Sequence, residues 1–200
     1  MTGTDFHSMG AEAGSPRRAM IDSQLRTSGV NQPWVLAAVA RVAREDFVPA
    51  DHRAAAYMDR AVPLGGGRFL AAPLFHGTAL AAAEPTTADK ALVVTAGAGY
   101  LAELLRPLVG SLDVVDAADV GAGLAGGYSL IVVDGAAGEL PEALTNALAE
   151  GGRIVTGLVQ GNLTRLASGR KTAGIITFAS VGDMGIPAIT EFATPKRWSF

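Results

Sequence analysis

The sequence predicts a single α/β domain in which a mostly parallel sheet follows a layer of helices, and three observations lead to this expectation. Beyond residue 90, short apolar runs bounded by turns alternate with helical patterns, which is typical of strands buried between helices. Before residue 85, apolar side chains recur at helical spacing. The length of 200 residues and the hydrophobic fraction of 49% suit one core. We expect a flexible leader over residues 1–14 and one domain over residues 15–200, with a helical layer over 15–85 and the sheet core over 90–200.

The N-terminal helices are predicted from their start and stop signals. Ser15 followed by Pro16 begins the first helix, and Gly29 ends it, because serine caps a helix, proline fits its first turn and glycine suits its C-terminal stop. Pro33 opens a second helix, which ends at Phe47-Val48-Pro49. The other elements expected here are a short helix and turn over 51–63, a glycine loop over 65–67 and a helix over 73–83.

The sheet core is predicted from five apolar runs, which cover residues 91–94, 112–115, 130–133, 154–159 and 175–181. Each run is short enough to be a buried strand and is bounded by turn residues. Helices are expected over 100–108 and 141–149, because leucines recur on one helical face in each segment.

Composition excludes several classes of protein. A net charge of −3 argues against a nucleic-acid partner, since phosphate neutralisation needs a basic surplus. The absence of cysteine excludes disulfides, thiol catalysis and cysteine zinc sites. The sequence contains no run of 18 apolar residues, so we expect no membrane partner. Residues 1–14 lack the apolar block of a signal sequence, so we expect a cytoplasmic protein. His7, His52 and His76 show no metal-ligand spacing, so no metal is expected and each histidine is interpreted as a surface or structural residue.

The strand-to-helix turn from Val94 to Tyr100 carries the most information about function. Glycines in such a turn let a ligand approach the backbone, and the helix that follows offers free N–H groups. Asp116 ends the next strand, 17 positions after Gly99, where an acidic residue often accepts hydrogen bonds from ribose hydroxyls. Spacing alone leaves two alternatives open, a nucleoside site and a turn that only reverses the chain.

The sequence resembles the protein-L-isoaspartate O-methyltransferase family over residues 15–200. The stretches that carry the resemblance are Met20-Ile21-Asp22-Ser23-Gln24-Leu25-Arg26, Val42-Ala43-Arg44-Glu45-Asp46-Phe47-Val48-Pro49, Ala56-Tyr57-Met58-Asp59, Val62-Pro63-Leu64-Gly65, Tyr128 to Ala136, Leu140 to Leu144, Glu150-Gly151-Gly152-Arg153 and the ending Phe192 to Phe200. The resemblance implies a Rossmann-like domain that binds S-adenosylmethionine and methylates the α-carboxylate of isoaspartyl residues in damaged proteins.

The resemblance also implies roles for particular residues. The cofactor site would comprise Thr95, Gly97, Gly99, Tyr100, Asp116, Asp134 and Gly135, and the substrate loop would comprise Leu70, Ala71, Ala72 and Pro73. For two of these residues a structural interpretation stays open beside the functional one. Tyr100 either shelters the cofactor or packs in the core, and Asp134 either faces a ligand or belongs to a turn.

Three departures from the family pattern bear on function. Thr95 stands where the family has the first glycine of its turn, so we expect a different turn or a narrower pocket, because a β-branched residue avoids positive φ. Ala71 replaces the serine or threonine that holds the substrate, so an orienting hydroxyl is lost. Only 12 residues separate Asp116 from Ser129, which is too few for another helix and strand, so we expect one edge strand to be missing.

The missing strand would expose the edge at residues 112–115. Such an edge needs covering, by residues 120–124 or by another copy of the chain, so a homo-oligomer is one expectation. Together the departures support two further hypotheses beside the methyltransferase: a scaffold that acts by binding or assembly, and an enzyme that uses the pocket for another small ligand.

Overall fold

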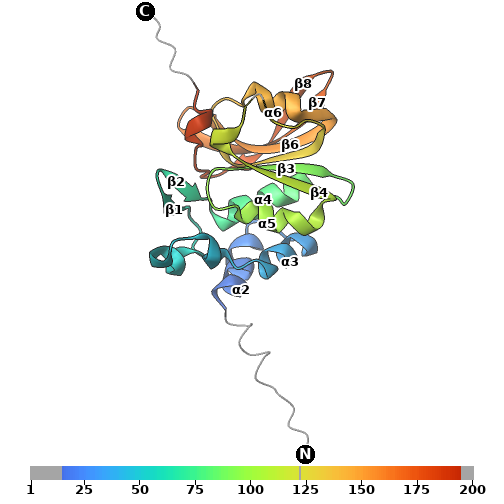
Figure 1. Cartoon of the computed structure of the whole chain (residues 1–200). Coiled ribbons are helices and arrows are strands. Elements are labelled where there is room, and N and C mark those ends of the chain that lie inside the picture. Colours follow the sequence, from blue (N-terminus) through green and yellow to red (C-terminus); the bar gives the residue numbers. More distant parts are fainter. Residues whose placement is uncertain (1–14, 122, 195–200) are drawn as a thin grey trace, which may run out of the picture.

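A six-stranded sheet in the order β4-β3-β5-β6-β7-β8 forms the centre of the protein (Figure 1). The computed structural model describes residues 15–121 and 123–194. The strands are β3 (Lys90–Thr95), β4 (Ser111–Asp116), β5 (Tyr128–Ala137), β6 (Leu148–Gln160), β7 (Leu163–Thr172) and β8 (Ile175–Asp183). The first four pair in parallel, and β7 and β8 continue the sheet antiparallel. The predicted mostly parallel sheet is therefore confirmed.

Helices lie on both faces of this sheet. Figure 1 shows α4 and α5 directly against the sheet, the N-terminal helices beneath them and α6 on the opposite face. The helices are α2 (Pro16–Met20), a π-helix over Ile21–Leu25, α3 (Pro33–Arg41), α4 (Pro73–Ala83), α5 (Tyr100–Leu105) and α6 (Glu142–Ala147), with 3₁₀ turns at Arg44–Phe47, Ala50–Ala55, Arg106–Leu108, Ala117–Asp119 and Thr190–Phe192. The Ser15 hydroxyl accepts a hydrogen bond from the Arg18 N–H at 3.2 Å, which confirms the predicted N-cap.

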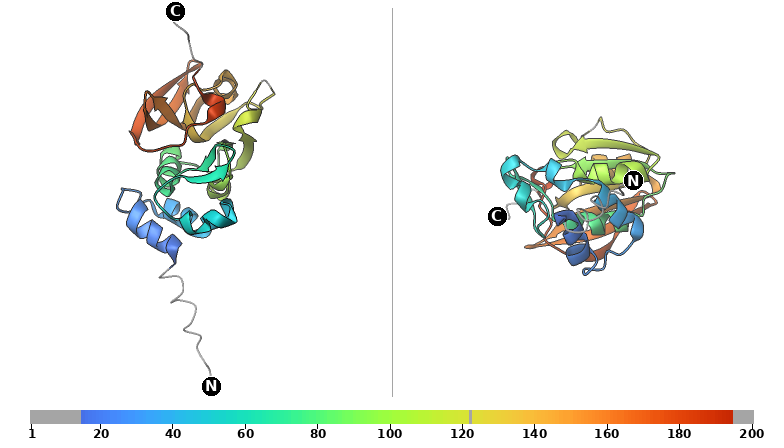
Figure 2. Two further views of the ribbon diagram at one scale, coloured as in Figure 1. Left: turned by 90° about the vertical axis from the view of Figure 1, so that its left-hand side faces the viewer. Right: turned by 90° about the horizontal axis from the view of Figure 1, so that it is seen from below.

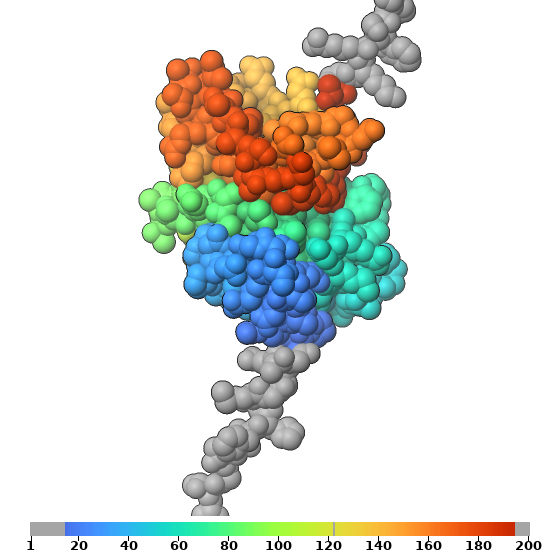
Figure 3. Space-filling view, turned by 180° about the vertical axis from the view of Figure 1, so that it is seen from behind, coloured from blue at the N-terminus to red at the C-terminus, as the bar shows by residue number. Residues whose placement is uncertain are grey.

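The strands alternate their side chains between two hydrophobic clusters. Ala91 and Val93 of β3 point into the larger cluster beneath α3, α4 and α5, whereas Leu92 and Val94 point into the smaller one on the α6 side. Figure 3 shows, from behind, the N-terminal helices and the C-terminal strands at opposite ends of the molecule. A strand with both faces covered has no polar side, which explains why β3 reads as an apolar run.

Several of the sequence-based expectations are wrong for physical reasons. The second helix ends at Arg41 and not at Phe47-Val48-Pro49, because Val42 is already extended, with a φ of −96° and a ψ of 120°. The predicted helix over 141–149 ends at Ala147, because Leu148 already begins the 13-residue strand β6. The strand β7 was not expected, because its sequence LTRLASGRKT contains neither an apolar run nor a regular alternation of polar and apolar residues. The expected glycine loop is present as the turn of a small hairpin that was not predicted: β1 (Val62–Gly65) pairs antiparallel with β2 (Arg68–Leu70). In the left view of Figure 2 this hairpin lies between the N-terminal helices and the C-terminal strands.

Strand β4 forms one edge of the sheet, as the short connection after Asp116 predicts. Within residues 117–121 and 123–127, no residue pairs with β4 as a strand. Val120 and Leu124 pack instead against the hydrophobic cluster on the α6 side, and the Val114 side chain is 43% exposed. The expectation that residues 120–124 cover the free edge is therefore wrong, because they cover a face of the sheet.

The described residues contain no helix that is long and apolar enough to cross a membrane. The leader over residues 1–14, with His7, and the ending from Pro195 to Phe200 lie outside the described residues.

Candidate functional site

Three of the predicted site residues meet at the carboxyl edge of the sheet. Thr95 ends β3 and is paired in register with Asp116 on one side and with Asp134 on the other. Neighbouring strands lie about 4.8 Å apart, so these side chains span about 10 Å of one edge. Ligands of open α/β sheets bind at this edge, where the chain crosses from one side of the first strand to the other.

The glycine turn that follows β3 is shaped by Gly97 and Gly99. Gly99 has a φ of 71°, a left-handed conformation that favours glycine, and it precedes α5. A Cβ at Gly97 would come within 2.6 Å of Leu64 Cδ1. Thr95 is not among the described residues with positive φ, and its hydroxyl accepts a hydrogen bond from the Gly97 N–H at 3.2 Å. Thr95 therefore adopts an ordinary strand conformation, and the turn does not require a positive φ at this position.

Asp116 is held by an arginine that the sequence did not single out. Arg68 Nη2 donates to Asp116 Oδ1 at 2.9 Å, and Nη1 donates to Oδ2 at 2.5 Å. Arg68 also lies 3.4 Å from Glu191 Oε1. The hydrogen bonds from Arg68 hold the pKa of the Asp116 carboxyl below its usual range. Both oxygens that would accept ribose hydroxyls are thus occupied by a guanidinium group.

The hairpin that carries Arg68 divides the space along this edge. On one side lies a cavity of about 170 Å³, lined by Asp134, Ala96, residues 66–69 and residues 187–191. On the other side lies an open cavity of about 570 Å³ that reaches Gly97 and Ala98. Arg68 lines both cavities. Ligand pockets usually measure about 300–1,000 Å³, so a nucleoside that spans the edge needs Arg68 to move away from Asp116.

The residues at the edge fit S-adenosylmethionine once Arg68 is displaced. Asp116 supplies two acceptors, and Gly97 and Gly99 supply close backbone. The hairpin is joined through a two-stranded sheet of its own, and its turn contains Gly66 and Gly67, both at positive φ. The Arg68 side chain is 36% exposed, and an ion pair of this exposure stabilises a protein by only about 0.2–1 kcal/mol, so displacing this side chain costs little.

A row of buried, hydrogen-bonded side chains runs from Arg44 through His76 to Asp134 and reaches the same edge from the helix side of the sheet. Arg44 Nη1 lies 2.9 Å from His76 Nδ1, and His76 Nε2 lies 2.9 Å from Asp134 Oδ1. The side chains of His76 and Asp134 are 1% and 7% exposed, and Arg44 is fully buried. Sequence reasoning interpreted His76 as structural and missed its contact with Asp134, because 58 positions separate the two residues along the chain.

Arg44 determines the protonation of this row of side chains. A guanidinium group can only donate hydrogen bonds, so His76 Nδ1 accepts and His76 Nε2 carries the hydrogen that is donated to Asp134. Burial lowers the pKa of His76 and favours the neutral ring. Arg44 also donates to the carbonyl oxygens of Ala56 and Ala71.

Tyr100 and the substrate loop pack against this row of side chains. The Tyr100 ring is 1% exposed and lies 5.0 Å from the Arg44 guanidinium and 5.1 Å from the His76 ring. Burial raises the pKa of Tyr100 to about 12. These contacts favour packing over sheltering a cofactor. Ala71 and Leu70 are buried, Pro73 begins α4, and the Ala71 carbonyl is fixed by Arg44, so the loop is held through its backbone.

Gly135 closes the edge beside Asp134. A Cβ at this position would lie 2.6 Å from Ile189 Cγ1. The next residue, Ala136, donates its N–H to Pro187 O at 2.8 Å and accepts from the Ile189 N–H at 2.8 Å. Glycine at position 135 therefore lets the C-terminal segment lie directly on β5.

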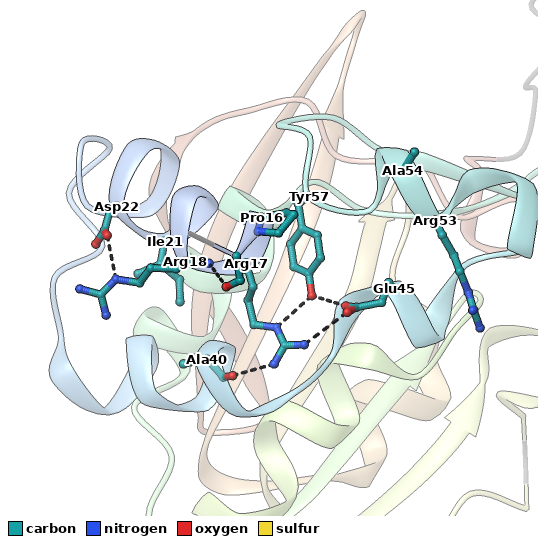
Figure 4. Close-up of a pocket in the computed structure, with 11 residues that line it drawn as sticks. Pro16, Arg17, Arg18, Ile21, Asp22, Ala40, Glu45, Arg53, Ala54 and Tyr57 are labelled. Atoms are coloured by element: carbon teal, nitrogen blue, oxygen red, sulfur yellow. Dashed lines mark hydrogen bonds and ion pairs between the residues drawn. The ribbon is translucent and has the colours of Figure 1, made fainter. Parts of the chain in front are cut away.

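A larger cavity, of about 940 Å³, lies in the N-terminal helical layer (Figure 4). Arg17, Tyr57 and Glu45 point toward one another there. Arg17 Nε donates to the Tyr57 hydroxyl at 2.9 Å, and this hydroxyl donates to Glu45. These groups satisfy one another, which indicates a structural cluster. Among the described residues, no group of three or more histidine, aspartate and glutamate side chains is arranged to hold a metal ion.

An open, mostly parallel sheet with a glycine turn after one strand and an acidic residue at the end of its neighbour defines the class of Rossmann-like nucleoside-binding domains. The family model for protein-L-isoaspartate(D-aspartate) O-methyltransferase matches residues 16–120. The chain belongs to this family.

Individual relatives agree with that assignment. The protein-L-isoaspartate O-methyltransferase of Koribacter versatilis is 32% identical over 193 residues, covering 84% of this chain and 87% of the relative. That of Methylorubrum populi is 33% identical over 164 residues, covering 70% and 77%. A crystal structure of a putative protein-L-isoaspartate O-methyltransferase from Plasmodium falciparum, in complex with S-adenosyl-L-homocysteine, superposes with a TM-score of 0.72 at 18% identity, covering 88% of this chain and 98% of that one. This likeness shows the common fold.

Proposed function

We propose that the protein transfers a methyl group from S-adenosylmethionine to the α-carboxylate of isoaspartyl residues in damaged proteins. One observation carries the proposal: the glycine turn at Gly97 and Gly99 and the carboxylate of Asp116 meet at the edge where open α/β sheets bind nucleosides. Both features, together with the substrate loop over 70–73, lie within the residues that match the family.

The bound donor supplies an electrophilic methyl group, and the residues of the chain supply orientation. Asp116 accepts hydrogen bonds from the ribose, and Gly99 lets the donor approach the start of α5. The acceptor carboxylate is already a nucleophile at neutral pH, so the chemistry needs alignment more than a base. Arg44 fixes the backbone of the substrate loop through the Ala71 carbonyl, which takes over part of the positioning that a hydroxyl at position 71 would give.

A groove beside the loop suits the peptide on either side of the modified residue. This groove measures about 710 Å³ and is lined mainly by apolar residues of the loop, of α4 and of the C-terminal segment: Phe69, Ala72, Leu74, Phe75, Met184, Ile186, Pro187 and Ala188. Phe69, Pro187 and Ala188 also line the cavity at Asp134. The shared wall supports a path for a peptide toward the methyl donor.

Two measurements test the proposal in sequence. Titration calorimetry with S-adenosylmethionine and S-adenosylhomocysteine is expected to show binding, and a peptide with one isoaspartate is expected to be methylated while the matching aspartate peptide is not. If neither nucleoside binds at high micromolar concentration, the methyltransferase proposal is wrong. Binding without methylation of the isoaspartyl peptide would reject that substrate and favour a binding protein or another acceptor.

We also propose that the free edge of β4 pairs with a second copy of the chain. In a two-fold antiparallel pairing that is centred between Asp113 and Val114, Ser111 lies opposite Asp116, Leu112 opposite Val115 and Asp113 opposite Val114. No like charges then face each other directly, and a symmetric interface of this kind closes on itself. The strand order supports the proposal, because β4 is paired with β3 alone among the described strands and an uncovered edge favours strand pairing.

A further inference from the structure

Asp134 is a buried carboxylate with one oxygen turned to the cavity of about 170 Å³. Its side chain is 7% exposed, and Oδ1 lies 2.9 Å from His76 Nε2. Among the residues that the structure describes, the hydrogen bonds of this carboxyl group go through Oδ1 alone. The second oxygen is not among the fully enclosed side-chain atoms of the described residues, so a donor that enters the cavity can reach it.

The neighbouring residues hold Asp134 in place and leave its second oxygen without a hydrogen-bond donor, although the positive charge of Arg44 also attracts the carboxylate from beyond His76. His76 donates to Oδ1 as a neutral ring, and its other nitrogen accepts from Arg44, which fixes the direction of the ring. Arg68 is the basic residue among those that line the cavity, and its bonds go to Asp116 and Glu191. Ala96, Gly66 and Ala188 leave room beside Asp134. The site is therefore a fixed acceptor that lines a small cavity.

A bound donor would bring a positive charge to this place. If the ribose lies at Asp116, the other end of the molecule runs across β3 toward β5, and the two aspartates are about two strand spacings, or about 10 Å, apart. The amino-acid end of S-adenosylmethionine carries an ammonium group. A lysine next to the isoaspartate would bring the same group from the peptide side.

We infer that Asp134 is the acceptor for an ammonium group of the bound ligand, and that His76 and Arg44 are positioning residues for it. The inference rests on the proposed function, because it needs a nucleoside at the same edge. The ammonium group belongs either to the amino-acid end of the donor or to a lysine of the peptide, and the same variant tests both sources.

The variant Asp134→Asn isolates the free oxygen. Its amide oxygen can still accept from His76, while its NH₂ group would face the ligand as a donor. S-adenosylhomocysteine carries the ammonium group, and 5′-methylthioadenosine lacks the whole amino-acid end. If the donor supplies the ammonium group, we expect Asp134→Asn to weaken the binding of S-adenosylhomocysteine at least tenfold and the binding of methylthioadenosine less than twofold, as measured by calorimetry. The matched control Asp116→Asn should weaken the binding of both nucleosides to the same extent.

A second assay tests the peptide as source. Isoaspartyl peptides with lysine or norleucine beside the modified residue differ in charge at nearly equal length. If the peptide supplies the ammonium group, the wild type prefers the lysine peptide in kcat/KM and Asp134→Asn loses that preference. The variant His76→Gln keeps one donor and one acceptor, so it should retain the selectivity of the wild type. If Asp134, His76 and Arg44 have only a structural role, no variant should change the selectivity.

Each outcome decides the inference. A selective loss in either assay supports it and names the source. Binding of both nucleosides and turnover of both peptides with unchanged ratios in Asp134→Asn overturns this inference and leaves the proposed function standing. If no nucleoside binds to the wild type, both proposals fail. Thermal unfolding of each variant shows that it folds.

Discussion

Arg68 and Asp116 compete with a ligand for the same oxygens. The Arg68 side chain is 36% exposed, and ion pairs of this exposure stabilise a protein by about 0.2–1 kcal/mol. We expect Arg68→Ala to bind S-adenosylhomocysteine about two- to fivefold more tightly, since no pair has to be broken first, and to lower the free energy of unfolding by less than about 1 kcal/mol. Calorimetry and urea denaturation measure the two quantities.

The matched control for this prediction is Arg106→Ala. Arg106 likewise forms an exposed ion pair, with Glu103 at 2.8 Å, and lies in an exposed turn away from the cavities at the sheet edge. Its replacement should leave ligand affinity unchanged. Weaker binding by Arg68→Ala would contradict the argument and would make Arg68 a ligand contact.

His76 gives the protein a pH dependence of known sign. Burial lowers the pKa of His76 in the folded state below the value of about 6.5 in the unfolded chain. As the pH falls, the unfolded state therefore takes up a proton before the folded state does. The free energy of unfolding has its full value above pH 6.5 and decreases as the pH drops below 6.5. We expect a loss of up to about 1.4 kcal/mol per pH unit between pH 6.5 and 5.5, measured by urea denaturation. His76→Gln should remove this slope, and an equal slope in the variant would assign it to another group.

At the residue scale, the sequence predicts those candidate site residues that lie near one another along the chain. Gly97, Gly99 and Asp116 follow from the spacing of a turn and the next strand end. His76 and Arg44 were missed, because a buried polar residue inside a helix or a 3₁₀ turn carries no local signal. Arg68 was missed because its partner lies 48 positions away, a contact that only the folded chain creates.

At the scale of elements, the close pairing of β5 with β6 determines where the end of β5, and with it Asp134, lies. A Cβ at Gly157 of β6 would lie 2.8 Å from both Ala136 Cα and Cβ and 2.9 Å from Gly135 O. These neighbours are mainly backbone, so β5 would have to shift next to Asp134. We expect Gly157→Ala to lower the free energy of unfolding by about 1–3 kcal/mol and to weaken ligand binding, as measured by denaturation and calorimetry.

Gly182 of β8 offers the matched substitution. A Cβ there meets no heavy atom within 4 Å, and Gly182 is not among the glycines with positive φ. Gly182→Ala should therefore change stability by less than about 0.5 kcal/mol. Equal effects at both positions would show that the approach of β5 to β6 does not limit the fold.

The elements differ in how far the sequence could predict them. Strands such as β3 are buried on both faces and read as apolar runs, so they were predicted almost to the residue. Strand β7 has mixed faces, and its pairing with β6 and β8 depends on tertiary contacts that no local pattern records. The hairpin of β1 and β2 is too short to give a periodic signal.

At the scale of the whole molecule, the sheet ends in two open edges, β4 and β8. The edge at β4 follows from the 12 residues between Asp116 and Ser129, which the sequence alone could show. Whether Val120 and Leu124 cover that edge or a face of the sheet could not be predicted, because their side chains are equally apolar in either position.

The free edge at β4 leads to a prediction about association. A pairing of two six-residue strands buries less surface than a stable interface requires, so the dimer should be weak. In sedimentation, we expect the mean mass to rise with concentration from 20.4 kDa toward twice that value. Val114→Lys places a charge on this edge and should keep the protein monomeric. Val181→Lys is the matched control, because Val181 is 41% exposed, close to the 43% of Val114, and lies on the opposite edge strand. If Val181→Lys rather than Val114→Lys abolishes association, the other edge forms the interface, and a constant mass of 20.4 kDa for the wild type would mean that the edge stays unpaired.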